Sequence, residues 1–191
     1  MKLVFASNNQ NKIQEMQLLL PATFQVLSLE AIGCYEEIPE TADNIEENAI
    51  LKANYVTEKY GYNCFADDTG LEVEALNGEP GVFSARYAGE NKDANANMDK
   101  LLGNLKDKSN RSAQFKTVIA LNLNGNQTLF TGIIKGKIIK EKIGANGFGY
   151  DPIFVADGYN KTFAELTIEE KSSISHRGLA VKQLIQFCYN L

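Results

Sequence analysis

The chain has 191 residues, 44% of them hydrophobic and 23% charged, with a net charge of −5 and a pI of about 5.0. This length and composition predict one soluble globular domain over residues 1–191, with room for two lobes. The net negative charge argues against non-specific electrostatic binding to nucleic acid or to an anionic membrane, but it permits a local basic pocket for one phosphorylated small molecule.

The three cysteines, Cys34, Cys64 and Cys188, are far apart and form no CxxC pair. They argue against a disulfide framework or a structural zinc site and favour a reducing compartment. The N-terminal apolar run at 2–6 is too short for a signal peptide, and no long apolar stretch occurs elsewhere. We therefore expect a soluble cytoplasmic protein.

Hydrophobic spacing predicts interleaved strands and helices. In chain order we expect a strand at 2–6, a helix after the polar loop at 7–12, a strand at 24–29, a helix at 45–60, strands at 64–66 and 71–76, a helix at 91–105, strands at 114–123, 128–134 and 136–142, a short strand at 153–155 and a last helix capped by Ser175. Asp43 and Glu46 have capping-box spacing, and Asn124-Gly125 favours a hairpin. The pattern indicates an α/β protein with a mixed sheet.

The stretch from Phe65 to Val73 is predicted to form a strand, an acidic turn and a second strand. Asp67 and Asp68 are adjacent where the first strand ends. Like charges repel and ionised carboxylates resist burial, so a bound divalent cation would explain the pair. An ordinary hairpin turn is the alternative, because Asp and Gly are common turn residues.

The polar loop at 7–12 lies between a strand and a helix, so backbone N–H groups and the positive end of the helix point at one spot. Lys12 falls in the first helical turn, where a cation is disfavoured unless an anion is bound. The loop lacks the glycines and the Lys-Ser/Thr ending of a Walker loop. It is either a phosphate site or a capped helix start with a solvated lysine.

Further candidate side chains follow along the chain. Glu40 and Glu47 add carboxylate oxygens that suit Mg²⁺, although acids are also favoured at a helix start. In the loop at 147–152, glycines allow close backbone approach and Phe148 offers a stacking face, unless the aromatics pack in the core. Lys171, His176 and Arg177 are donors for oxygen acceptors, with a surface helix cap as the alternative.

Six motifs are spread along the length of the chain. They are Ser7-Asn8-Asn9-Gln10-Asn11-Lys12, Glu40-Thr41 with Glu47-Asn48-Ala49-x-x-Lys52-Ala53, Ala66-Asp67-Asp68-Thr69-Gly70-Leu71, Pro80-Gly81-x-x-Ser84-Ala85-Arg86-Tyr87, Gly147-Phe148-Gly149-Tyr150-Asp151-Pro152 and Ser175-His176-Arg177. Together they resemble the inosine triphosphate pyrophosphatase family, also described as dITP/XTP pyrophosphatases. The departures are small: Ser7 and Thr69 exchange one hydroxyl residue for another, and Ala42 stands where glycine is frequent.

The resemblance implies a Mg²⁺-dependent hydrolase that converts ITP, dITP and XTP to the monophosphate and pyrophosphate, clearing deaminated purines from the nucleotide pool. It implies an elongated mixed sheet with two lobes, a central substrate cleft and a homodimer. The resemblance also implies a role for residues that match the family's motifs. The phosphates would be held by Ser7, Asn8, Asn9, Gln10, Asn11, Lys12 and Lys52, whereas Asp68 would be the general base and a metal ligand, with Glu40 as the second metal ligand. Thr69 would touch the substrate, and the base and sugar would be held by Phe148, Gly149, Tyr150, Asp151, Lys171, His176 and Arg177.

Three other functions are compatible with parts of the sequence. A pyrophosphatase acting on other modified nucleotides would differ only in its substrates. A nucleotide-binding regulator without turnover would not need the acids Glu40, Asp67 and Asp68. An RNA-binding module is disfavoured by the acidic balance.

Overall fold

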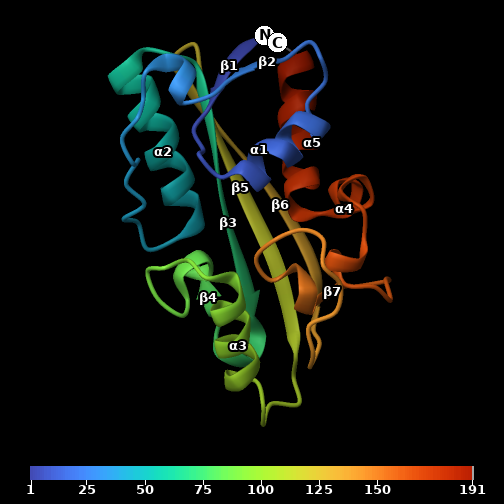
Figure 1. The fold of residues 1–191 in the computed structure, drawn as a ribbon. Coiled ribbons are helices and arrows are strands. Elements are labelled where there is room, and N and C mark those ends of the chain that lie inside the picture. The colour runs from blue at the N-terminus through green and yellow to red at the C-terminus, as the bar shows by residue number, and fades with distance from the viewer. Residues whose placement is uncertain (191) are drawn as a thin grey trace. The chain divides into compact units, whose positions relative to one another are not determined.

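The computed structural model describes residues 1–190, which form a mixed α/β fold. Within these residues one seven-stranded sheet has the order β2-β1-β3-β5-β6-β7, with β4 paired to β3 (Figure 1). The strands are β1 (Lys2–Phe5), β2 (Gln25–Leu27), β3 (Cys64–Val73), β4 (Pro80–Gly81), β5 (Ser112–Leu123), β6 (Asn126–Ile138) and β7 (Phe154–Ala156), and the α-helices are α1 (Gln10–Leu19), α2 (Ile45–Tyr60), α3 (Ala94–Asn104), α4 (Ile168–Ile174) and α5 (His176–Tyr189). Strand β1 is parallel to β2 and β3, whereas β3–β4 and β6–β7 are antiparallel. The predicted α/β class with a mixed sheet is confirmed.

The chain divides into two compact units. The first comprises Met1–Asp68, Thr117–Gly132 and the described residues from Arg177 onward, and the second comprises Thr69–Lys116 and Ile133–His176. Strands β3, β5 and β6 each belong to both units, so the division falls inside strands and not in a linker. Each unit has its own hydrophobic cluster.

The core of the first unit lies under α1 and α5. Phe5 of β1 and Phe65 of β3 stack with their ring centroids 4.8 Å apart, and Met16 of α1 and Val181 of α5 belong to the same buried cluster. Helix α2 lies on the other side of these strands (Figure 1). Side chains of a strand alternate between faces, so neighbouring residues of β3 point toward different helices.

The core of the second unit is rich in aromatic rings. Phe115 of β5 packs edge-on against Phe154 of β7 at 4.7 Å and stacks with Phe163 at 6.0 Å, measured between centroids. Leu101 of α3 is fully buried in the same cluster. Gly136 of β6 lies so close to the main-chain oxygen of Val155 and the ring of Phe154 that a Cβ at this position would overlap both, which explains a glycine in mid-strand.

Strand β3 corrects the prediction of an acidic turn. Residues 64–73 form one uninterrupted strand, and Asp67 and Asp68 are in its middle. Strand β1 pairs with β3 only as far as Phe5 opposite Phe65, so the two aspartates lie just beyond the end of β1. The turn prediction failed because it assumed that paired carboxylates could not be buried in a strand, whereas cations from other elements surround them here.

Several element boundaries also differ from the prediction. The cap of α2 is Asn44, whose side chain accepts the N–H of Glu47 at 2.8 Å, and not Asp43. Helix α3 begins at 94 behind the cap Asp93, and β6 continues to 138 where two strands were expected. The predicted stop of α2 at Gly61 is confirmed by its left-handed backbone.

Two further features concern the cysteines and the lengths of the helices. All three cysteines are buried, and each has a free thiol. Within residues 1–190, no helix has both the length and the apolar character needed to cross a membrane.

Candidate functional site

The polar loop at 7–12 is a capped helix start. Asn9 is the N-cap of α1, and its Oδ1 accepts the N–H groups of Asn11 at 3.0 Å and Lys12 at 3.2 Å. The hydroxyl of Ser7 accepts the N–H of Asn9 at 3.2 Å. These bonds order the loop, and they engage two of the helix-end N–H groups that the sequence suggested for an anion. The ammonium of Lys12 is then the main cationic group that this loop offers to an anion.

Lys12 extends from α1 to Asp67 of β3. Its Nζ lies 3.1 Å from Asp67 Oδ1 and 3.3 Å from the main-chain oxygen of the same residue. On the other carboxylate oxygen, Arg177 of α5 donates from Nε at 3.2 Å and from Nη2 at 3.0 Å. Arg177 also donates through Nη1 to Glu15 of α1. Asp67 and Arg177 are each 1% exposed, so this is a buried ionic cluster.

The cluster keeps Asp67 ionised. Burial alone would raise the pKa of this carboxyl, but the charges of Lys12 and Arg177 outweigh burial and hold the pKa well below its usual range. Arg177 keeps a raised pKa for the same reason: burial opposes its charge, and Asp67 and Glu15 favour it more strongly. A carboxylate held in this way is a poor proton acceptor, which separates Asp67 from the role of a general base.

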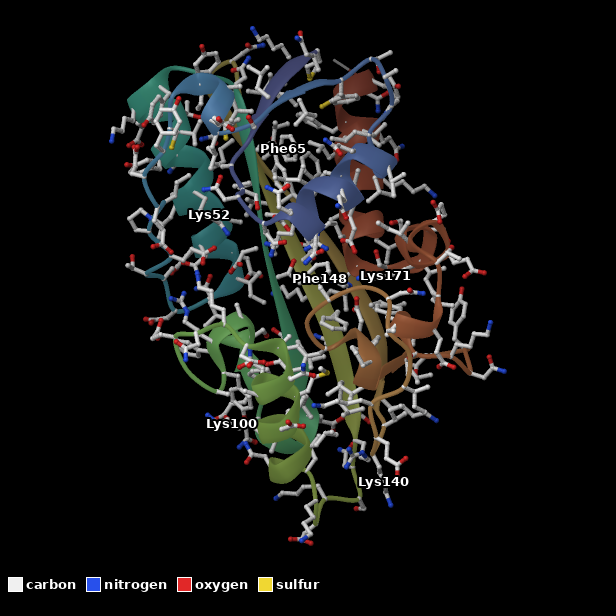
Figure 2. All side chains as sticks on the ribbon, viewed as in Figure 1. Lys52, Phe65, Lys100, Lys140, Phe148 and Lys171 are labelled. Carbon is white, nitrogen blue, oxygen red and sulfur yellow. The ribbon has the colours of Figure 1, made fainter. Side chains whose placement is uncertain are left out.

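Asp68 has different neighbours, because its side chain points to the other face of β3. Lys52 of α2 places its Nζ 3.6 Å from Asp68 Oδ1 and 2.5 Å from Glu40 Oε1; Figure 2 labels Lys52 on its helix. The Oδ2 atom of Asp68 is buried and has no hydrogen-bond partner among residues 1–190. Burial raises the pKa of Asp68, with Lys52 and Lys12 opposing the change. The result is a buried carboxyl with one oxygen available to a ligand or a proton.

Glu40 and Asp68 form a modest pair of oxygen donors. No group of three or more His, Cys, Asp or Glu side chains suitable for a metal ion occurs in residues 1–190. Mg²⁺ sites that also use substrate phosphates need only one or two protein carboxylates, with waters completing the shell. The orphaned Asp68 oxygen and the carboxylate of Glu40 therefore fit Mg²⁺ bound together with a polyphosphate, and they do not fit a closed protein cage.

In the second unit, Lys171, Asp151 and Phe148 form one contact group. Lys171 Nζ lies 2.6 Å from Asp151 Oδ2 and 4.7 Å from the centroid of the Phe148 ring, and Figure 2 shows the labelled Phe148 and Lys171 near each other. The same Asp151 oxygen accepts the N–H of Phe148 at 2.8 Å. At Gly147, whose φ is +72°, a Cβ would collide with the Asp151 carboxylate. The loop at 147–151 is thus wrapped around one buried ion pair.

The side chains of His176 and Tyr150 are buried in the second unit. The imidazole of His176 stacks on Phe115 at 4.6 Å and on Phe163 at 6.3 Å, measured between centroids. The hydroxyl of Tyr150 donates to the Ser84 carbonyl at 2.8 Å, and burial raises the pKa of this phenol. Their ring orientations are therefore set by packing. Thr69, the first residue of this unit, is half-buried on β3.

The predicted site residues fall into two groups, one in each unit. In the first unit, contacts join Lys12 with Asp67 and Lys52 with Glu40 and Asp68, and Arg177 joins the Asp67 cluster. In the second, contacts join the residues Phe148, Asp151 and Lys171. Asn8 and Gln10 are exposed, and Gly149 supplies a turn with φ of +63°.

Glu15 belongs to the buried ionic cluster, and the sequence did not reveal it. It is 4% exposed on α1, although a glutamate among polar helix residues usually faces solvent. Its partner Arg177 is 162 positions away, so no local pattern links them. The only available signal is its spacing of three residues from Lys12, which places both on neighbouring helix positions.

A sequence model of the Ham1 family matches residues 3–187. The dITP/XTP pyrophosphatase of Flavobacterium psychrophilum is 68% identical over 190 residues and covers 100% of both chains. Among solved structures, the Staphylococcus aureus Ham1 protein has a TM-score of 0.91 and 43% identity, covering 100% of this chain and 99% of that one. A HAM1 protein from Coxiella burnetii has a TM-score of 0.92 and 41% identity, covering 100% of each. The family expected from the motifs is confirmed, and the chain belongs to the Ham1 family.

Proposed function

We infer that this chain hydrolyses non-standard purine nucleoside triphosphates, with ITP, dITP and XTP as substrates and pyrophosphate and the monophosphate as products. The observation that carries this inference is the likeness over the full length to a relative named dITP/XTP pyrophosphatase. The buried, half-satisfied Asp68 beside Lys52 supports it, because such a carboxyl is suited to accept a proton.

In the proposed reaction a water oxygen attacks the α-phosphorus, and its proton passes to the carboxylate of Asp68. The bond from the α-phosphorus to the bridging oxygen breaks, and pyrophosphate leaves with the bonding electron pair. Lys12 and Lys52 offset the negative charge of the phosphates, with Ser7, Asn8, Asn9, Gln10 and Asn11 shaping the loop around them. The raised pKa of Asp68, caused by burial, favours its role as acceptor.

We propose Mg²⁺ as the cofactor, held by Glu40 and Asp68. The orphaned oxygen of Asp68 supports this assignment, as does the shared contact of both carboxylates with Lys52. When bound, the ion would neutralise phosphate charge. Lys52 supplies part of the same neutralisation from the protein, since it faces both carboxylates and carries a raised pKa: burial lowers it, and the charges of Asp68 and Glu40 more than compensate.

The second unit is proposed to hold the base and sugar. Phe148 would stack on the purine, and Lys171 and Asp151 would meet its polar edge, with Thr69, Gly149, Tyr150 and His176 completing the surroundings. Hypoxanthine and xanthine carry a 6-oxo acceptor where adenine carries a 6-amino donor, so fixed donors discriminate against adenine. Arg177 remains a proposed base-reading residue, although Asp67 and Glu15 already engage its guanidinium.

The chain itself links the two groups of residues. Asp68 of the first unit precedes Thr69 of the second, and His176 of the second precedes Arg177 of the first. This continuity supports the proposal that residues 1–191 act as one domain on one substrate.

The remaining proposals concern assembly and location. A homodimer is proposed on the family resemblance, and light scattering would test it. The buried free thiols support a cytoplasmic location. The net charge of −5 supports a free nucleotide, rather than nucleic acid or a membrane surface, as the partner.

The test is pyrophosphate release from ITP, dITP, XTP, GTP and ATP, each with Mg²⁺ and with EDTA. We expect rapid release from the first three only, and none in EDTA. A preference for another modified nucleotide would redirect the substrate assignment. Nucleotide binding without release from any substrate would indicate a regulator and contradict the inference.

A further inference from the structure

The two carboxylate oxygens of Asp67 serve two different cations. Oδ1 faces the ammonium of Lys12 at 3.1 Å, and Oδ2 accepts two bonds from the guanidinium of Arg177, at 3.2 Å and 3.0 Å. With both oxygens engaged and 1% of the residue exposed, Asp67 has no direct access to a substrate from solvent. Any effect of Asp67 on chemistry must therefore pass through one of its partners.

The contacts of Asp67 close a ring of four charges. Lys12 on α1 bonds Asp67 on β3, Asp67 bonds Arg177 on α5, and Arg177 bonds Glu15, which is again on α1. Two positive and two negative groups cancel, which is the condition under which buried ions are tolerated. Because the ring begins and ends on one helix, it fixes α1, and with it the loop at 7–12, relative to β3.

The ring explains why the two neighbouring aspartates differ. Asp67 lies on the face of β3 that carries Phe65 and is covered by α1 and α5, and Asp68 lies on the face toward α2. Asp67 meets Lys12, and Asp68 meets Lys52. The strand thus presents one carboxylate to each of two lysines that come from opposite sides.

We propose that Asp67 is a positioning residue that fixes the Lys12 ammonium for the polyphosphate, with Arg177 holding Asp67 in place. This rests on the proposed function, in which Lys12 binds phosphate. Asp67 lowers the mobility of Lys12 without adding positive charge to the site. Its contribution should therefore appear in kcat, where alignment matters, and not in KM.

The chain offers a matched control in Glu15. Asp67→Asn and Glu15→Gln each remove one buried negative charge from the same ring and leave Arg177 with one carboxylate, but only the first releases Lys12. Steady-state pyrophosphate release from ITP with Mg²⁺ gives kcat and KM for both variants. Thermal melting confirms that each variant is folded at the assay temperature.

We expect Asp67→Asn to lower kcat about 30-fold with KM changed less than about threefold, and Glu15→Gln to lower kcat by no more than about threefold. Equal losses in the two variants would overturn the proposal, because the effect would then come from Arg177 or from general destabilisation. A loss confined to KM would overturn it as well.

A double variant keeps the test valid if Asp67→Asn folds poorly. Lys12→Met with Asp67→Asn leaves the ring electrically neutral, and we expect its kcat to equal that of Lys12→Met within about twofold. If the second substitution still costs about 30-fold in the Lys12→Met background, Asp67 does not act through Lys12.

A readout without nucleotide separates this proposal from the proposed function. The acetylation rate of Lys12 by acetic anhydride, followed by mass spectrometry, reports how firmly the ammonium is held. We expect about a fivefold faster reaction in Asp67→Asn and no change in Glu15→Gln. This holds even if the wild-type protein releases no pyrophosphate, and equal rates in wild type and Asp67→Asn would refute the positioning role.

Discussion

The two units bury their charged side chains in different surroundings. The first unit holds Lys12, Lys52 and Arg177 against carboxylates from several elements, with few aromatic rings at the contacts. The second unit holds one ion pair, Lys171 with Asp151, beneath the ring of Phe148 and beside Phe163. Alternating point charges are suited to a polyanion, whereas flat rings with one polar edge are suited to a purine.

The difference matches the separate roles proposed for the two units, one for phosphate and one for the base. Phosphate recognition needs cations, and in the first unit each buried cation lies beside a carboxylate. Base recognition needs an aromatic plane and oriented donors, and the second unit has the Phe148 ring beside the ion pair of Lys171 and Asp151. Variants in one unit should therefore leave the other unit's contribution intact.

The largest effect is expected from Asp68→Asn. Loss of the proposed proton acceptor should lower kcat about 1,000-fold with Mg²⁺ present, while the fold is kept because asparagine has the same shape. Pyrophosphate release and thermal melting measure the two properties. A kcat close to that of the wild type would remove Asp68 from the base role.

Glu40→Gln is expected to weaken Mg²⁺ binding rather than the stability of the fold. Glu40 is half-buried, and its substitution removes one of the two proposed anionic ligands, so the Mg²⁺ concentration for half-maximal rate should rise about 30-fold. Mg²⁺ titrations of activity and isothermal calorimetry would show this. Glu36→Gln is the control, because Glu36 bonds Tyr55 and Lys59 away from Asp68. An unchanged Mg²⁺ requirement would place the ion elsewhere.

Phe148→Leu should sharpen the contrast between the units. Removing the stacking plane is expected to raise KM for ITP about tenfold, since base stacking on an aromatic ring contributes about 1–3 kcal/mol. Binding of inorganic tripolyphosphate, which has no base, should stay as in the wild type. If calorimetry showed both ligands weakened equally, the assignment of separate roles to the two units would be wrong.

The smallest expected effect is on the pH dependence of folding stability, to which the two aspartates should contribute with opposite signs. The pKa of Asp67 is lowered on folding by Lys12 and Arg177 against the effect of burial, so its stabilising contribution is present above the unfolded pKa of about 3.9 and is lost as pH falls toward the folded value. The pKa of Asp68 is raised by burial, so its contribution is present below the unfolded pKa and is lost as pH rises through the folded value.

Urea unfolding of the wild type, Asp67→Asn and Asp68→Asn between pH 3 and 7 would measure this difference. As pH rises, the free energy of unfolding of Asp67→Asn should decrease relative to that of the wild type. The free energy of unfolding of Asp68→Asn should increase relative to that of the wild type. The same sign for both variants would contradict the assignment of their surroundings.

Local sequence signals located the ends of several elements. The periodicity of α2 and its stop at Gly61 are short-range properties of the backbone, and they were predicted correctly. The cap of the same helix was misplaced by one residue, because Asp43 and Asn44 are both good caps and only backbone geometry selects Asn44. Strand β6 was divided at Gly136, whose presence reflects contact with β7 and not a break.

The sequence by itself determined the alternation of strands and helices, the family and the residue types of the site, because these depend on spacing and on motifs within short stretches. Only the tertiary structure decided that Asp67 and Asp68 lie inside one strand, that they face different lysines, and that Glu15 is buried against Arg177. The physical reason is that a buried carboxylate is stable only if a cation is near it. Here those cations come from helices distant in sequence, which no local pattern can place.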